Sequence, residues 1–309
     1  MRFIRTAFLA TTILSAGGSL AQADVKVVTS IKPVHSLVSA VMAGVGEPSL
    51  LVKGAGSPHT YALKPSQAQL LQDAELVFWM SHDLEAFLEN SIESIATNAK
   101  SVPLMEAHGL TKLAFREGGA FDSHDHDDHD DHDEHAHHGE DPHVWLDPVN
   151  AKAMVHEIEE ALVEADPSNA AAYEANAEAL MSRLDDLVAE IDAELEPVKG
   201  RGYVVFHDAY QYFEARFGVS AVGSITVSPE VLPGAERVAE LQDKVRDLGA
   251  TCVFSEPQFE PKLVATVTEN TNAGTGVLDP LGASIKDGPD LYFTLIRNMA
   301  KSLKDCLLK

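Results

Sequence analysis

The sequence is poor in cysteine and in basic residues, and it has no long apolar run. Its 309 residues include two cysteines, and 23 lysines and arginines stand against 48 aspartates and glutamates, for a formal net charge of -25. No segment supplies the roughly 18 consecutive apolar residues that a membrane-spanning helix needs. An acidic surface repels nucleic-acid phosphates and anionic membranes. We therefore expect no nucleic-acid partner and no membrane-spanning segment in the mature chain.

The N-terminus has the three parts of a secretory signal peptide. MRFIR is followed by the apolar stretch TAFLATTILSA and then by AQA before Asp24. This pattern predicts a signal peptide over residues 1–23, cleaved after Ala23, with an uncleaved anchor as the alternative. No cysteine at the predicted cleavage site could carry a lipid. We expect a free protein of the periplasm.

Cys252 and Cys306 both lie in the exported part of the chain. A cysteine-based metal site needs clustered thiols, and these two stand far apart in the sequence. An oxidising compartment allows an exported pair to form a disulfide. We therefore predict a Cys252–Cys306 disulfide.

Short apolar, β-branched runs alternate with amphipathic stretches along most of the chain. This alternation is typical of parallel α/β sheets, and it occurs twice. We predict an N-terminal α/β lobe over 24–165 and a C-terminal α/β lobe over 200–309. The expected strands are 25–30, 49–53, 75–80 and 101–104 in the first lobe, and 202–206, 220–225, 251–254 and 275–278 in the second.

One long helix is predicted between the lobes, over 166–199. Its apolar residues recur every three or four positions, and no glycine or proline interrupts them before Pro197. A single rigid helix could run along both lobes; a helical hairpin or a coiled-coil dimer face are the alternatives. We expect a monomer. The apolar stripe consists of Tyr173, Ala177, Leu180, Leu184, Leu187, Ile191 and Leu195.

Four possible metal ligands lie beside predicted strands and helices. His207 and Asp279 follow the strands GYVVF and TGVL, His59 lies in the connection after SLLVK, and His143 precedes a helix near Pro148. Parallel sheets build ligand sites at the carboxyl ends of their strands. Three imidazoles and one carboxylate would suit Zn²⁺. Taken singly, each residue could equally be a surface, capping or turn residue.

A zinc hydrolase is the enzyme alternative. In such an enzyme three histidines hold the metal and an open fourth position activates water. The sequence contains no zincin, GxSxG or phosphate-loop motif. We therefore expect no enzyme activity.

Several stretches together resemble a known family. PHTYALKPSQAQLLQDAELVFWM, DPHVWLDP, VVFHDAYQYFEARFG, SPEVLPGAE, EPQF and VLDPLG are similar to the metal-binding class of periplasmic substrate-binding proteins, and most similar to the zinc-uptake proteins of ABC transporters. The resemblance implies two lobes joined by a rigid helix, with the metal in the cleft between them. It maps the ligands onto His59, His143, His207 and Asp279.

The resemblance implies a protein that captures Zn²⁺ and delivers it to the membrane permease and ATPase of an ABC importer. Manganese and iron relatives usually carry a carboxylate where this chain has His207, so a nitrogen there favours zinc. A manganese or iron carrier of the same fold, or a zinc buffer without a transporter, are the alternatives. Some zinc members have a glutamate before the first ligand. Here that position is Pro58, so Asp279 or water could be the fourth ligand.

Residues 122–141 are dominated by aspartate and histidine, with Ala136 as the one apolar side chain. Such a segment cannot bury enough surface to offset its ordering entropy, and we expect a disordered loop. A flexible loop of this composition could bind zinc weakly and raise the local supply beside His143. A merely solvating acidic loop is the alternative, but it would not explain the histidines. The predicted auxiliary ligands are His124, His126, His129, His132, His135, His137 and His138.

Overall fold

The fold is taken from a computed structural model of the chain. It describes residues 25–116, 121, 139–226, 235–247, 250–260, 262–269 and 271–309. The predicted signal peptide, 1–23, lies outside the described residues. So do the seven histidines of the segment 124–138.

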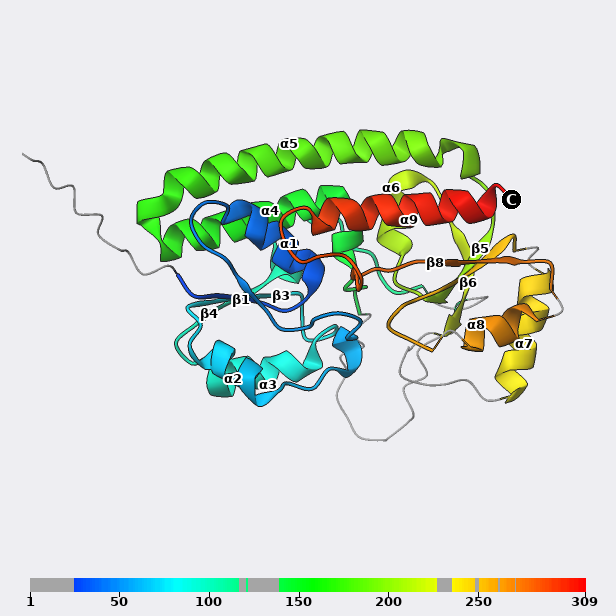
Figure 1. The fold of residues 1–309 in the computed structure, drawn as a ribbon, viewed down its shortest axis with the longest axis horizontal. Coiled ribbons are helices and arrows are strands. Elements are labelled where there is room, and N and C mark those ends of the chain that lie inside the picture. Colours follow the sequence, from blue (N-terminus) through cyan, green and yellow to red (C-terminus); the bar gives the residue numbers. More distant parts are fainter. Residues whose placement is uncertain are drawn as a thin grey trace, which may run out of the picture.

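The N-terminal half forms a parallel four-stranded sheet in the order β2-β1-β3-β4. Its central strands β1 and β3 are largely apolar and fully buried, as expected where helices cover a parallel sheet, whereas β4 at the edge is partly exposed. Helices α1, α2 and α3 connect them (Figure 1). The elements are β1 (Val27–Thr29), α1 (Lys32–Val41), β2 (Ser49–Leu50), α2 (Pro65–Gln72), β3 (Leu76–Trp79), α3 (Ala86–Ile95) and β4 (Lys100–Pro103).

The C-terminal half repeats this plan with the strand order β6-β5-β7-β8, again all parallel. Parallel neighbours need a crossover, and helices α6, α7 and α8 supply it. The elements are β5 (Tyr203–His207), α6 (Gln211–Phe217), β6 (Ala221–Thr226), α7 (Ala235–Asp247), β7 (Cys252–Ser255), α8 (Lys262–Thr268), β8 (Gly274–Val277) and α9 (Leu291–Leu307). The two-lobed α/β fold predicted from the sequence is confirmed.

The long helix α5 (Ala170–Leu195) extends over both halves (Figure 1). It follows α4 (Pro148–Ala165) after one short turn, and it packs against α1, α4 and α9. All seven residues of the predicted apolar stripe are buried. The stripe is therefore part of the protein's own core. The 3-10 turns are η1 (Pro58–Thr60), η2 (Leu104–Glu106), η3 (Val144–Leu146), η4 (Pro167–Asn169) and η5 (Glu196–Val198).

The predicted disulfide is confirmed. Cys252, the first residue of β7, is bonded to Cys306 in the last turn of α9. Both residues are buried. The bond ties the C-terminal helix to the centre of the second sheet.

Direct hydrogen bonds join the two halves close to their sheet edges. The indole Nε1 of Trp145 donates to the carbonyl of Pro280 (2.9 Å), and the Tyr292 hydroxyl donates to the carbonyl of Trp145 (2.6 Å). Lys32 Nζ donates to the carbonyl of Ile285 (2.7 Å). These buried bonds hold the carboxyl ends of the two sheets against each other. In the described part of the chain, no helix combines the length and the apolar character needed to cross a bilayer.

Candidate metal centre

Three of the four predicted ligands lie together where the two halves meet. His59 lies in η1 after β2, His143 directly precedes η3, and His207 is the last residue of β5. One ring nitrogen from each lies within 4.8 Å of the others. The ring centroids are 5.3 to 5.7 Å apart, so the three imidazoles form a nearly even triangle. This group could hold a metal ion.

Two buried carboxylates orient two of the imidazoles. Asp141 Oδ1 lies 2.6 Å from Nδ1 of His143, and Glu256 Oε1 lies 2.7 Å from Nδ1 of His207. A carboxylate only accepts, so each Nδ1 carries the proton and donates it. In a neutral ring, the proton at Nδ1 leaves Nε2 with a free lone pair. Both histidines are therefore set as ligands through Nε2.

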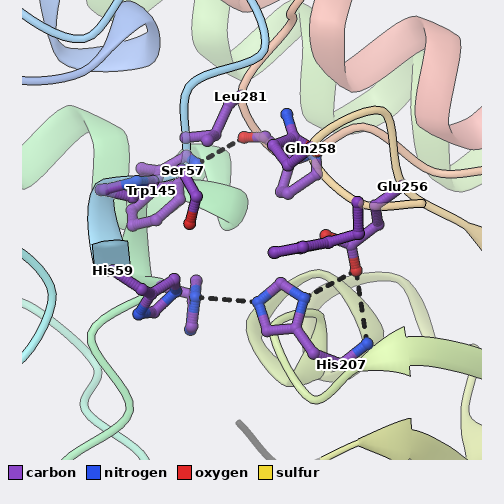
Figure 2. A pocket seen from close by; sticks show the side chains of 11 residues that line it. Ser57, His59, Trp145, His207, Glu256, Gln258 and Leu281 are labelled. Atoms are coloured by element: carbon purple, nitrogen blue, oxygen red, sulfur yellow. Dashed lines mark hydrogen bonds and ion pairs between the residues drawn. The ribbon is translucent and has the colours of Figure 1, made fainter. Parts of the chain in front are cut away.

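The two Nε2 atoms of His143 and His207 face each other at 3.5 Å. Two nitrogens bound tetrahedrally to one zinc, each at 2.0 to 2.1 Å, would stand about 3.4 Å apart. The observed separation fits a shared zinc ion. Figure 2 shows His59 and His207 directed toward the same space, with Glu256 bonded to His207 from behind.

The charges around the site favour a cation. Asp141 and Glu256 are both buried, and the ion pairs of the described residues include no lysine or arginine at either carboxylate. Buried charges need a partner of opposite sign. A divalent ion bound to the two imidazoles would provide it.

His59 and His207 differ in how readily they take up a proton. Burial, together with the charges of His143 and His207, lowers the pKa of His59 to about 2. Burial also opposes a charge on His207, but the charge and hydrogen bond of Glu256 outweigh it and raise the pKa of His207. Protons therefore compete with a metal at His207 as the pH falls, whereas His59 stays neutral.

The walls of the site are mostly apolar. Trp145 and Phe259 lie against the imidazoles, at centroid distances of 5.2 Å from His143 and 6.0 Å from His207. The cavity has a volume of about 10 Å³, which is room for one ion or one water. Apolar walls of this kind strengthen the electrostatic interaction between the ligands and an ion.

Asp279 lies outside the group of three histidines. Its Oδ1 accepts from Gln258 Nε2 (3.0 Å) and from the backbone of Gly282 (2.9 Å), and its Oδ2 accepts from the backbone of Ala283 (2.6 Å). In this arrangement Asp279 stabilises the turn after β8. Both of its oxygens are already engaged.

Asp141 and Glu256 were not identified as site residues from the sequence. Glu256 directly follows β7, which is the neighbour of β5 in the sheet, so Glu256 and His207 leave adjacent strands at the same edge. If the strand order had been known, the position of Glu256 at the end of a strand next to β5 would have indicated a site residue. Asp141 stands two residues before His143, and that spacing alone carries no signal.

We predict that Asp141→Asn and Glu256→Gln each weaken zinc binding by about 10- to 100-fold, because a neutral amide oxygen is a weaker acceptor for Nδ1–H than a carboxylate and no longer balances the charge of the ion. Competition titration with a chromophoric chelator measures the change. Glu85→Gln is the matched control, because Glu85 is a buried carboxylate that accepts from the backbone of Met80 (2.8 Å) and contacts no described histidine. Unchanged affinity in both site variants would show that the carboxylates do not orient the ligands.

Comparison with known proteins places this chain in a family. The family described as zinc-uptake complex component A, periplasmic, matches residues 27–306. The high-affinity zinc uptake system protein ZnuA of Brucella suis is 55% identical over the whole of both chains, and that of Yersinia pestis is 37% identical over 99% of this chain and 98% of its own.

Solved structures agree. A crystal structure of ZnuA superposes with a TM-score of 0.78 at 27% identity, covering 92% of this chain and 99% of the other. The zinc-bound structure of a ZnuA deletion mutant superposes with a TM-score of 0.75 at 26% identity, covering 92% and 98%. The chain belongs to the periplasmic zinc-uptake component A family.

Proposed function

We propose that this protein captures one Zn²⁺ in the cleft between its lobes, through His59, His143 and His207, and delivers it to the membrane permease of an ABC importer in the periplasm. The observation that carries the proposal is the pair of Nε2 lone pairs facing each other at 3.5 Å. Both Nδ1 protons are already donated to buried carboxylates. Such a pair is repulsive unless a cation lies between the nitrogens.

Zinc suits this site better than manganese or iron. Three imidazoles form a nitrogen-rich set, whereas manganese prefers carboxylate, carbonyl and water oxygens. The similar proteins from Brucella and Yersinia are named for high-affinity zinc uptake. A titration with Zn²⁺ and Mn²⁺ should give the tighter constant with zinc.

The hydrolase alternative loses support. A zinc hydrolase needs space beside the metal for its substrate. The cavity here is small, at about 10 Å³, which speaks against a substrate site beside the metal. The relatives are also named as uptake proteins.

Transport is tested by growth of a deletion strain under zinc chelation. The strain should grow poorly, and the intact gene should restore growth, whereas a His207→Ala gene should not. A zinc buffer without a transporter is separated by cellular uptake of radioactive zinc. Uptake that is the same with and without the protein would contradict delivery to a permease.

We propose that water is the fourth ligand rather than Asp279. The carboxylate is held by the turn that follows it, and to reach the metal it would have to give up these hydrogen bonds. Asp279→Asn keeps one acceptor oxygen for the turn. We therefore expect this variant to retain tight zinc binding within about threefold in a competition titration. A loss of the size expected for a ligand, about 10²- to 10³-fold, would make Asp279 the fourth ligand instead.

We also propose that the histidines between 124 and 138 collect zinc beside the cleft. Deleting residues 124–138 should remove the weaker sites and leave one tight site, because His143 lies outside the deletion. Calorimetric titration of the intact and shortened proteins measures both. Loss of the tight site, or an unchanged stoichiometry, would contradict the proposal. The matched control replaces the seven histidines with asparagine at unchanged length.

A further inference from the structure

Helix α6 of the C-terminal half is bonded to two stretches of the N-terminal half, 113–116 and 139–147. The Tyr212 hydroxyl donates to the backbone carbonyl of Asp141 (2.8 Å). Gln211 Nε2 donates to the side chain of Asp141 (2.6 Å). Since Asp141 also holds His143, α6 contacts the support of one metal ligand. The same helix follows directly on β5, which ends in His207.

Arg116 adds ion pairs to these contacts. Its guanidinium binds the carboxylate of Asp208, with Nε at 3.0 Å from both oxygens, and its Nη1 donates to Glu214 (2.7 Å). Arg116 keeps 22% of its side-chain exposure, and the two carboxylates keep 10% and 5%. Asp208 is the residue after His207. The planar fork of an arginine holds such carboxylates in a fixed geometry.

A second ion pair lies at the other end of α6. Arg216 donates to both oxygens of Asp147, at 2.7 and 2.8 Å. Asp147 also caps α4 by accepting from the backbone of Val149 (2.8 Å). Along the chain, His143 stands between Arg116 and Asp147. The stretch that carries His143 is thus bonded to the C-terminal half at Asp141 and at Asp147.

We propose that Arg116 is a positioning residue: its ion pairs with Asp208 and Glu214 hold His207 against the chain that carries His143 and so slow the release of zinc. The inference rests on the proposed function, because it assumes that the three histidines bind zinc. An ion held from both lobes leaves when the ligands separate. A largely buried pair with fixed geometry resists that separation, since breaking it leaves a carboxylate buried without its partner.

The test measures the rate of zinc release from the full-length protein. Zinc-loaded protein is mixed with excess chelator in a stopped-flow instrument. Arg116→Gln should release zinc about tenfold faster, the size expected when a residue couples to a site through a bonded network. The rate of zinc uptake should change less. Arg116→Lys keeps the positive charge but loses the planar guanidinium with its paired donors. It should give an intermediate rate of zinc release.

The matched control is Arg297→Gln. Arg297 also makes a two-bonded pair, with Glu190 (2.7 and 2.8 Å), but it joins α9 to α5 at an exposed position. Its release rate should equal that of the unaltered protein. A release rate for Arg116→Gln within about twofold of the unaltered protein, with or without a lower melting temperature, would overturn the proposal.

A second variant covers the case in which Arg116→Gln does not fold. Arg116→Met combined with Asp208→Asn and Glu214→Gln replaces all three charged groups by neutral ones, a change that often leaves stability intact. It still removes the tie to Asp208, so release should again be about tenfold faster, and an unchanged rate would overturn the proposal. Failure of the proposed function itself would be distinguishable, because the unaltered protein would then show no tight zinc binding in the same instrument.

Discussion

Replacing His143 or His207 with alanine is expected to weaken zinc binding by about 10²- to 10³-fold. A zinc site of this kind is worth roughly 10 to 16 kcal/mol in all, so each of a few ligands contributes about 3 to 4 kcal/mol, and 1.4 kcal/mol is a factor of ten. Removing either imidazole also leaves Asp141 or Glu256 without its hydrogen-bond donor in the cleft. The loss should therefore be no smaller than the ligand's own share. Competition titration against a high-affinity chelator measures it.

His156→Ala is the matched control for these variants. His156 lies on α4 with 57% of its side chain exposed, and it pairs with Glu159 and Glu160 of its own helix. The tight site should be unaffected by this change. Nanomolar binding that persists in both the His143 and the His207 variant would mean that the tight site lies elsewhere.

Replacing both Cys252 and Cys306 with alanine is expected to lower the free energy of unfolding by about 4 kcal/mol. The disulfide closes a loop of 54 residues, and the loop-entropy relation gives this value for that length. The bond also joins a central strand to α9, which packs on α5 and α1. Urea unfolding monitored by circular dichroism measures the change.

The same variant should keep its tight zinc site. Cys252 begins β7, and Glu256 directly follows the last residue of that strand. The disulfide and the metal centre therefore lie at opposite ends of β7. A loss of zinc binding in folded protein would contradict this separation. An unfolding free energy equal to that of the unaltered protein would contradict the stabilising role of the disulfide.

Local patterns were sufficient to predict the two sheets and the long helix. Most strands are short buried runs, with β4 and β8 partly exposed, and the stripe from Tyr173 to Leu195 repeats with the period of a helix. The positions of His59 and His207 could be inferred in the same way, from strands that precede them. These features depend on neighbours in the sequence.

The contacts that orient the ligands depend on residues far apart in the chain. Glu256 reaches His207 across 49 positions, because β7 lies beside β5 in the strand order. Arg116 reaches Asp208 across 92 positions. No periodicity in the sequence indicates such pairs. Whether Asp279 is a ligand or a turn residue could not be decided from the sequence, because a strand-end aspartate fits both.

The most direct test of the account is a crystal structure of the zinc-loaded protein with anomalous data collected at the zinc edge. We expect one strong peak in the cleft, at about 2.0 to 2.1 Å from a ring nitrogen of each of His59, His143 and His207, with a water in the fourth position. The Nδ1 atoms of His143 and His207 should still be bonded to Asp141 and Glu256. A main peak away from these three histidines, or a cleft without zinc under saturating conditions, would contradict the account.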